Sequence, residues 1–301
     1  MTVAAWLHPV LALLLSPLLL GVINRTKAFF AGRNGPPLLQ AYYDLWKLLH
    51  KGAVYSRTTT WIFRSGPIVG LASVFTALLL MPFGPLPAPL GFEGDLILFV
   101  GLLALMRFFT VIAALDTGSS FEGMGASREV QFSALAEPAL LLGLAVVGRL
   151  TGHLSLSGMF VSISVTTWSK AGPTLALVGV ALVVILLAEN SRIPVDDPNT
   201  HLELTMIHEV MVLDHSGPDL AYISYGIELK LWVLGTLAAG LLPHLGAPLA
   251  DALIALGALL VLAISIGVIE STFARLRLTR VPQFLAGAGV LSLLALLLVL
   301  R

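Results

Sequence analysis

The chain contains no cysteine among its 301 residues. This absence excludes iron–sulfur clusters held by thiolates, thiolate zinc sites and disulfide bonds. Any electron transfer linked to this protein must therefore take place in partner proteins.

Charge is also scarce, since charged residues make up 11% of the sequence against roughly 25% in a soluble domain. The formal net charge is zero, so the chain lacks the basic surface that nucleic-acid binding requires. Hydrophobic residues make up 57%, and several apolar runs approach or exceed the roughly 20 residues that cross a bilayer. The composition predicts an all-α polytopic membrane protein.

Hydropathy predicts eight transmembrane helices within a single integral membrane domain covering residues 1–301. The predicted ranges are about 3–23, 65–83, 94–115, 130–150, 172–189, 219–242, 247–269 and 281–300. The first run lacks preceding basic residues and a small-residue cleavage site. We therefore expect a retained helix and not a signal peptide.

Basic residues gather in the connections about 24–64 and 270–280. The positive-inside rule makes these two connections, with 116–129 and 190–218, cytoplasmic loops. Eight spans then place both termini on the outer side. In the first loop, PPLLQAYYDLWKLLHKG has apolar residues at helical spacing, which predicts an interfacial amphipathic helix. This helix would be a membrane anchor, a docking platform for a partner, or both.

Ionisable residues inside spans are costly and are therefore functional candidates. Glu129 and Glu137 lie eight residues apart, so both carboxylates share one helix face. A row of buried carboxylates can hold and pass protons. The residues predicted for such a path are Asp116, Glu129, Glu137, Glu189, Glu228 and Lys230. The alternatives are a purely structural ion pair at Arg107 and hydrated span ends at Glu189 and Glu270.

A polar stretch, AENSRIPVDDPNTHLELTMIHEVMVLDHSG, follows the fifth predicted span. Two prolines break the helix, and a near capping box predicts a short helix at about 201–213. His201 and His208 are two helical turns apart, but HEVMV lacks the second histidine of a zinc-protease motif, so we predict no metal site. A histidine that titrates near neutral pH remains a candidate for proton transfer.

The same stretch resembles the acidic signature of a family of membrane proteins in NADH–quinone oxidoreductase, the respiratory complex I subunit 1 family, which joins the hydrophilic arm to the membrane arm. The matching residues are Ala188, Glu189, Arg192, Pro194, Asp196, Pro198, Glu203, Leu204, Ser216 and Gly217. The segment RNGPPLLQAYYDLWKLLHK resembles a second family motif through Arg33, Gly35, Pro36, Leu39, Gln40, Asp44, Lys47 and Leu48. SREVQFSALAEP resembles the segment where a glutamate, here Glu129, enters a span.

Two further segments, LDTGSSFEGMGASRE and FARLRL, are more similar to the branch of this family found in membrane-bound nickel–iron hydrogenases of the formate hydrogenlyase and hydrogenase 4 type. Asn199 and His201 stand where the complex I form has a denser acidic run, and Asp214-His215 replaces its Glu-Tyr. In the complex I form this segment borders the mouth of the quinone tunnel, so the resemblance implies that the departures fall there. Quinone binding is therefore left open, with a cavity near Glu189 and Asp196 as the candidate.

The resemblance implies a non-catalytic subunit, without a cofactor of its own, in a prokaryotic inner (plasma) membrane. Its expected partners are lipid, antiporter-like membrane subunits, and hydrogenase-like large and small subunits that carry iron–sulfur clusters and, in a hydrogenase, a nickel–iron centre. It would couple their electron transfer to proton or sodium movement. The expected coupling-loop and interface residues are Arg33, Asp44, Arg128, Arg192, Asp196, His201, Glu203 and His208. A structural anchor without an ion path, and a stand-alone secondary transporter, remain the alternatives, although no inverted repeat is visible.

Overall fold

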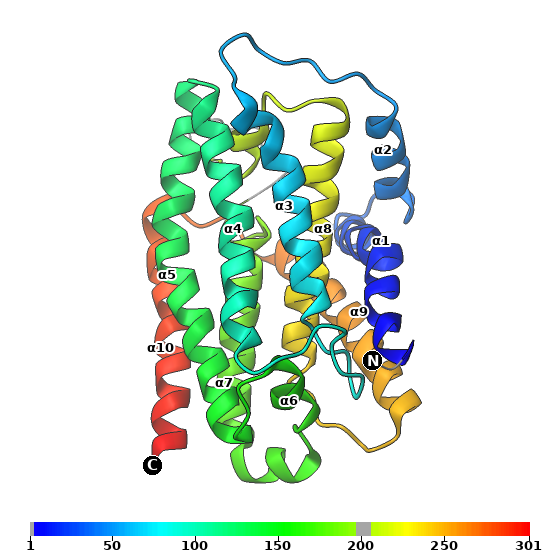
Figure 1. Cartoon of the computed structure of the whole chain (residues 1–301), viewed down its shortest axis with the longest axis vertical. Helices are drawn as coiled ribbons and strands as arrows, with labels where there is room; N and C mark the ends of the chain where they lie inside the picture. The colour runs from blue at the N-terminus through cyan, green and yellow to red at the C-terminus, as the bar shows by residue number, and fades with distance from the viewer. Residues whose placement is uncertain (1–2, 197–205) are drawn as a thin grey trace.

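The computed structural model describes residues 3–196 and 206–301, and the regular structure in these ranges is helical (Figure 1). The long helices are α1 (Leu7–Phe30), α3 (Trp61–Leu79), α4 (Asp95–Asp116), α5 (Ser120–Thr151), α7 (Val165–Glu189), α8 (Gly217–Ala239), α9 (Pro248–Thr272) and α10 (Val281–Leu300). The short elements are η1 (Val3–Trp6), α2 (Gln40–Leu49), α6 (Leu156–Val161), η2 (Glu209–Val212) and η3 (Leu278–Arg280).

The eight long helices agree with the eight predicted spans. Within the described ranges, every long helix except α8 is apolar enough to cross a membrane by length and composition alone. In α8, the charged Glu228 and Lys230 lower the hydropathy. This helix packs against α1, α3, α7 and α9, and its residues 228–237 are all buried. A span shielded by other helices can carry charges that a lipid-facing span cannot.

The connections alternate between two ends of the bundle. One end holds α2 and the segments 31–60, 117–119, 190–196, 206–216 and 273–280, and we call it the basic end. Both chain termini lie toward the opposite end (Figure 1). This arrangement matches the predicted grouping of the four polar loops on one side.

The predicted loop 116–129 is wrong in its length. Helix α5 begins at Ser120 and is 32 residues long, so only residues 117–119 connect it to α4. Hydropathy identifies only the apolar part of a helix. The first turns of α5 are polar and pack against η2, so hydropathy does not include them in the helix. Glu129 consequently lies inside the helix, not at its start.

The predicted helix at about 201–213 is also wrong where the structure describes it. Residues 209–212 form a single turn of 3-10 helix, η2, and residues 206–208 are not helical. The cause is tertiary: Asp196 accepts the backbone N–H groups of Ile207 and His208, both at 3.1 Å, and this holds the chain in a loop. Four apolar side chains of this segment are nonetheless buried against the bundle, Met206, Ile207, Val210 and Met211. Leu202 and Leu204 lie outside the described residues.

The predicted amphipathic helix in the first loop is present as α2. One face of it packs on the bundle through Ala41, whereas Tyr43 and Trp46, with Leu39 just before the helix, remain exposed. The Tyr42 hydroxyl ties it to α1 by donating to the Leu14 carbonyl. An exposed apolar face beside the bundle is the form expected of a helix lying in the membrane interface.

Helix α1 crosses α9 at a close backbone approach. A Cβ added at Gly267 would lie 2.6 Å from the Thr26 Cβ and 3.0 Å from the Ile23 carbonyl oxygen. On the same helix, a Cβ at Gly257 would meet open space. The two glycines therefore form a matched pair for testing the helix contact.

We predict that Gly267→Ala lowers the thermal unfolding temperature of the full chain in detergent, because overpacking costs about 1–3 kcal/mol. Gly257→Ala should leave this temperature unchanged. Tryptophan fluorescence during heating measures both. Equal unfolding temperatures for the two variants would contradict the α1–α9 contact.

Candidate functional site

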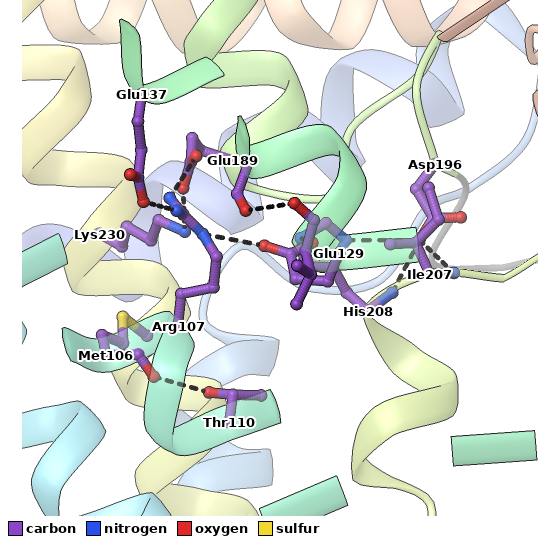
Figure 2. A network of polar contacts seen from close by, with 12 residues as sticks. Met106, Arg107, Thr110, Glu129, Glu137, Glu189, Asp196, Ile207, His208 and Lys230 are labelled. Atoms are coloured by element: carbon purple, nitrogen blue, oxygen red, sulfur yellow. Dashed lines mark hydrogen bonds and ion pairs between the residues drawn. The ribbon is translucent and has the colours of Figure 1, made fainter. Parts of the chain in front are cut away.

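A buried arginine in the middle of α4 gathers three carboxylates. Arg107 Nε lies 3.1 Å from Glu129, its Nη2 lies 2.6 Å from Glu189, and its Nη1 contacts Glu137 (Figure 2). Glu129 and Glu137 come from α5, and Glu189 ends α7. The prediction that Glu129 and Glu137 share a helix face is confirmed, because both reach the same guanidinium.

The network continues into α8. Lys230 Nζ lies 2.7 Å from the second carboxylate oxygen of Glu189, so this glutamate stands between two cations. The side chains of Arg107, Glu189 and Lys230 are at most 8% exposed. Unpaired charges at this depth would be strongly destabilising, so the four helices α4, α5, α7 and α8 are bound together by charge.

At its other side the network reaches the segments 190–196 and 206–210. His208 Nε2 lies 3.0 Å from Glu129, and its Nδ1 lies 3.6 Å from Asp196. Asp196 also pairs at 2.9 Å with Arg275, a residue of the connection between α9 and η3. Figure 2 shows His208 between Glu129 and Asp196. The histidine therefore connects the basic-end loops to the buried cluster.

The electrostatic environment favours a charged His208. Burial alone would lower the pKa of this imidazole, but the carboxylates of Glu129 and Asp196 outweigh it and raise the pKa to about 9. Burial alone would raise the pKa of the Asp196 carboxyl. His208 and Arg275 lower it by more than burial raises it, so this pKa lies below its usual range. At neutral pH the bridge is therefore an ion pair on both sides of the imidazolium.

A second cluster lies where α1, α9 and the end of α7 meet. Glu270 pairs with Lys27 at 2.7 Å and with Arg192 at 3.4 Å, and its side chain is fully buried. The interpretation that Glu189 and Glu270 are simply hydrated span ends is therefore wrong, because both are buried and ion-paired.

A cavity of about 370 Å³ separates the two clusters. Its lining includes Asn24, Asn190, Arg192, Glu189 and Glu228. Glu228 is 5% exposed, and no cation lies within ion-pair distance of it in the described part of the chain. Polar and apolar side chains line the cavity together, and its polar groups and its volume meet the needs of ordered water.

Other predicted site residues lie apart from this network. Asp116 accepts the backbone N–H of Thr60 at 2.6 Å and therefore stabilises the start of α3. Arg128 donates to the Met206 carbonyl at 2.7 Å, which ties α5 to the loop. Arg33 and Asp44 are exposed at the basic end. His201 and Glu203 lie outside the described residues.

Sequence reasoning missed Lys27 and Arg275 as network members. Both were visible only as basic residues at span ends. Their partners, Glu270 and Asp196, are 243 and 79 positions away along the chain by residue number. The pairing depends on which helices are neighbours, which hydropathy does not report. Among the described residues, no group of three or more histidine, aspartate or glutamate side chains is arranged to hold a metal ion.

The helical bundle with a buried ionic network defines a polytopic membrane protein with charged groups in its interior. A family model described as NADH dehydrogenase matches residues 2–300, and the chain belongs to this family. It is 34% identical to formate hydrogenlyase subunit 4 of Escherichia coli (strain K12), over 91% of each chain. It is 32% identical to hydrogenase-4 component C of the same organism, over 80% of this chain and 75% of that one.

The similarity to complex I proteins is lower: the chain is 27% identical to an NADH-quinone oxidoreductase subunit of Rubrobacter xylanophilus, over 72% of this chain and 67% of that one. A chain in the solved structure of the membrane-bound sulfane sulfur reductase, an archaeal respiratory membrane complex, has the same fold. Its TM-score is 0.81 at 23% identity, with 98% of each chain covered. The predicted family and its hydrogenase-type branch are confirmed.

The His208 bridge predicts a defined dependence of stability on pH. Because the folded-state pKa lies above the unfolded value of about 6.5, the stabilisation is complete below that pH and is lost as the pH rises through about 9. The difference in unfolding temperature between the wild type and His208→Gln should therefore shrink across this window.

The exposed His153 provides the control for this measurement. His153→Gln should follow the wild type at every pH. A difference between wild type and His208→Gln that stays constant from about pH 6 to 10 would rule out a charged bridge.

Proposed function

We propose that this chain is the membrane subunit of a hydrogenase-type or complex I-like assembly, and that it anchors a soluble redox module and couples electron transfer to ion translocation. The observation that carries the proposal is the chain of close ionic contacts that links Asp196 at the basic end with Lys230 inside the bundle. The names of the relatives support the type of assembly.

The coupling begins at the loop. His208 and Asp196 belong to a segment that packs over the start of α5, where a Cβ at Gly125 would lie 2.8 Å from the Ile207 carbonyl oxygen. A partner subunit that shifts this segment changes the distance between His208 and Glu129. The charge state of a histidine is sensitive to such a change.

The coupling then passes inward by exchange of ionic partners. Arg107 contacts three carboxylates at once, so a change at Glu129 alters how its guanidinium is shared with Glu137 and Glu189. Glu189 in turn shares its charge with Lys230. The next acceptor is Glu228, two residues from Lys230 and beside the cavity. Protons are the ions that this sequence of carboxylates fits best.

The redox centres belong to the partners in this proposal. Iron–sulfur subunits, with a nickel–iron centre in a hydrogenase, would bind at the basic end, which would face the cytoplasm of a prokaryotic cell, and antiporter-like subunits would lie beside the bundle in the inner membrane. The cavity near Glu189 and Asp196 is also the candidate site for a quinone headgroup, where lining groups such as Asn190 and Arg192 would donate to the carbonyl oxygens.

Dense ion pairing also favours a second candidate, a structural anchor without an ion path. The two functions differ in what a charge-neutral substitution does. A static ion pair contributes to folding and assembly, whereas a path residue contributes to ion movement in an assembled complex.

We predict that Glu228→Gln leaves assembly and electron transfer from an artificial donor intact, and reduces ion translocation at least about tenfold, because the unpaired carboxylate is needed to accept the ion. Ion movement and redox turnover are measured together in vesicles that contain the assembled complex. Glu93→Gln is the control, since Glu93 is exposed at the opposite end of the bundle.

The proposal is contradicted if Glu228→Gln, Glu189→Gln and Glu129→Gln complexes all assemble normally and translocate ions at the wild-type rate. That result would exclude an ion path through these residues and favour the structural anchor.

A further inference from the structure

A narrow apolar groove runs along the outside of the bundle between α7, α8, α9 and α10. Its volume is about 500 Å³, and every side chain that lines it is apolar apart from the indole nitrogen of Trp168. That nitrogen donates to the Leu241 carbonyl at 2.7 Å. The groove is separate from the polar cavity and from the residues of the ionic network.

The groove follows the part of α7 after its kink at Ala171. Its lining extends along this part from Leu175 to Leu187, which is about 18 Å at 1.5 Å per residue, more than half of the hydrocarbon thickness of about 30 Å. At one end lie Trp168 and Leu242, and at the other lie Pro194, Phe273 and Phe284, which belong to the basic end.

The lining of the groove suits a hydrocarbon chain. Apart from the Trp168 indole nitrogen, which already donates to Leu241, the lining side chains offer no polar partner, so a polar occupant would leave its own groups unsatisfied. Ala176 and Gly179 of α7 contribute small side chains to the lining, which leaves room for an acyl chain against the helix.

Positive charge lies at the basic end of the groove. Arg280 is four residues before the groove-lining Phe284, which is about one helical turn. Arg277 directly precedes the short helix η3, which ends at Arg280. Both arginines are exposed, and no carboxylate of the described residues forms an ion pair with either. Arginine at the membrane surface attracts anionic headgroups.

We propose that this groove binds an anionic phospholipid, with an acyl chain along α7 and the phosphate held by Arg277 and Arg280. The site does not depend on the proposed coupling role. The lipid fills a depression between α9 and α10 at the edge of the bundle.

The test is lipid binding to the purified full chain and to the assembled complex, measured by native mass spectrometry in detergent. The probes are phosphatidylglycerol and phosphatidylcholine with identical acyl chains. Wild type should bind phosphatidylglycerol more tightly, and the double variant Arg277→Gln/Arg280→Gln should lose about tenfold or more of that affinity, because each arginine near the surface contributes separately.

Two further variants distinguish the groove from general surface charge. Ala176→Phe should reduce the binding of both lipids, because the ring occupies the groove. Lys51→Gln/Arg57→Gln removes two exposed charges from another basic-end segment and should change nothing. Unfolding temperatures measured beside the affinities identify any variant that fails to fold.

Equal phosphatidylglycerol affinity in the wild type and in a folded Arg277→Gln/Arg280→Gln variant would overturn the proposal. So would an assembled complex that retains no phospholipid at this groove because a partner subunit covers it.

Discussion

The Arg107 guanidinium is the group on which the arrangement of the bundle depends. It projects from the middle of α4 and is 8% exposed, so its charge must be met by protein groups. Its three carboxylates come from α5 and α7. Removing one partner of a buried ion pair costs about 3–5 kcal/mol. A slip of α4 along either neighbour would separate these partners, so the ionic contacts fix a helix register that apolar packing alone leaves less specific.

The same requirement explains why residues 206–208 do not form a helix. Asp196 accepts two backbone N–H groups and pairs with Arg275. A helical conformation at residues 206–208 would withdraw those N–H groups into the helix and leave a buried carboxylate short of donors. Tertiary charge pairing thus overrides a local sequence that favours helix through its capping residues and its lack of proline and glycine.

The sequence predicts those features of the fold that depend only on the composition and spacing of apolar residues. Eight long helices follow from apolar runs, and the interfacial helix follows from the spacing of Leu39, Tyr42 and Trp46. The sequence identifies four intramembrane residues, Glu129, Glu137, Glu189 and Lys230, because an ionisable group inside a span is costly and therefore marks a functional site or a buried pair. Their partners were not identifiable, since the Lys27–Glu270 and Arg107–Glu189 pairs depend on helix neighbours. Asp116 matched the same pattern, yet its carboxylate accepts the Thr60 amide at the start of α3.

The charge balance of the network gives His208 a role that its position at the basic end alone does not suggest. Arg107, Lys230, Arg275 and protonated His208 face Glu129, Glu137, Glu189 and Asp196, so the opposite charges are equal in number. Loss of the proton from His208 leaves one net negative charge among groups that are mostly buried. An uncompensated buried charge is costly, so this loss favours uptake of a proton by one of the carboxylates or by Glu228 beside the cavity. A movement of the loop at the surface is in this way tied to protonation inside the bundle, because the buried charges cannot change independently.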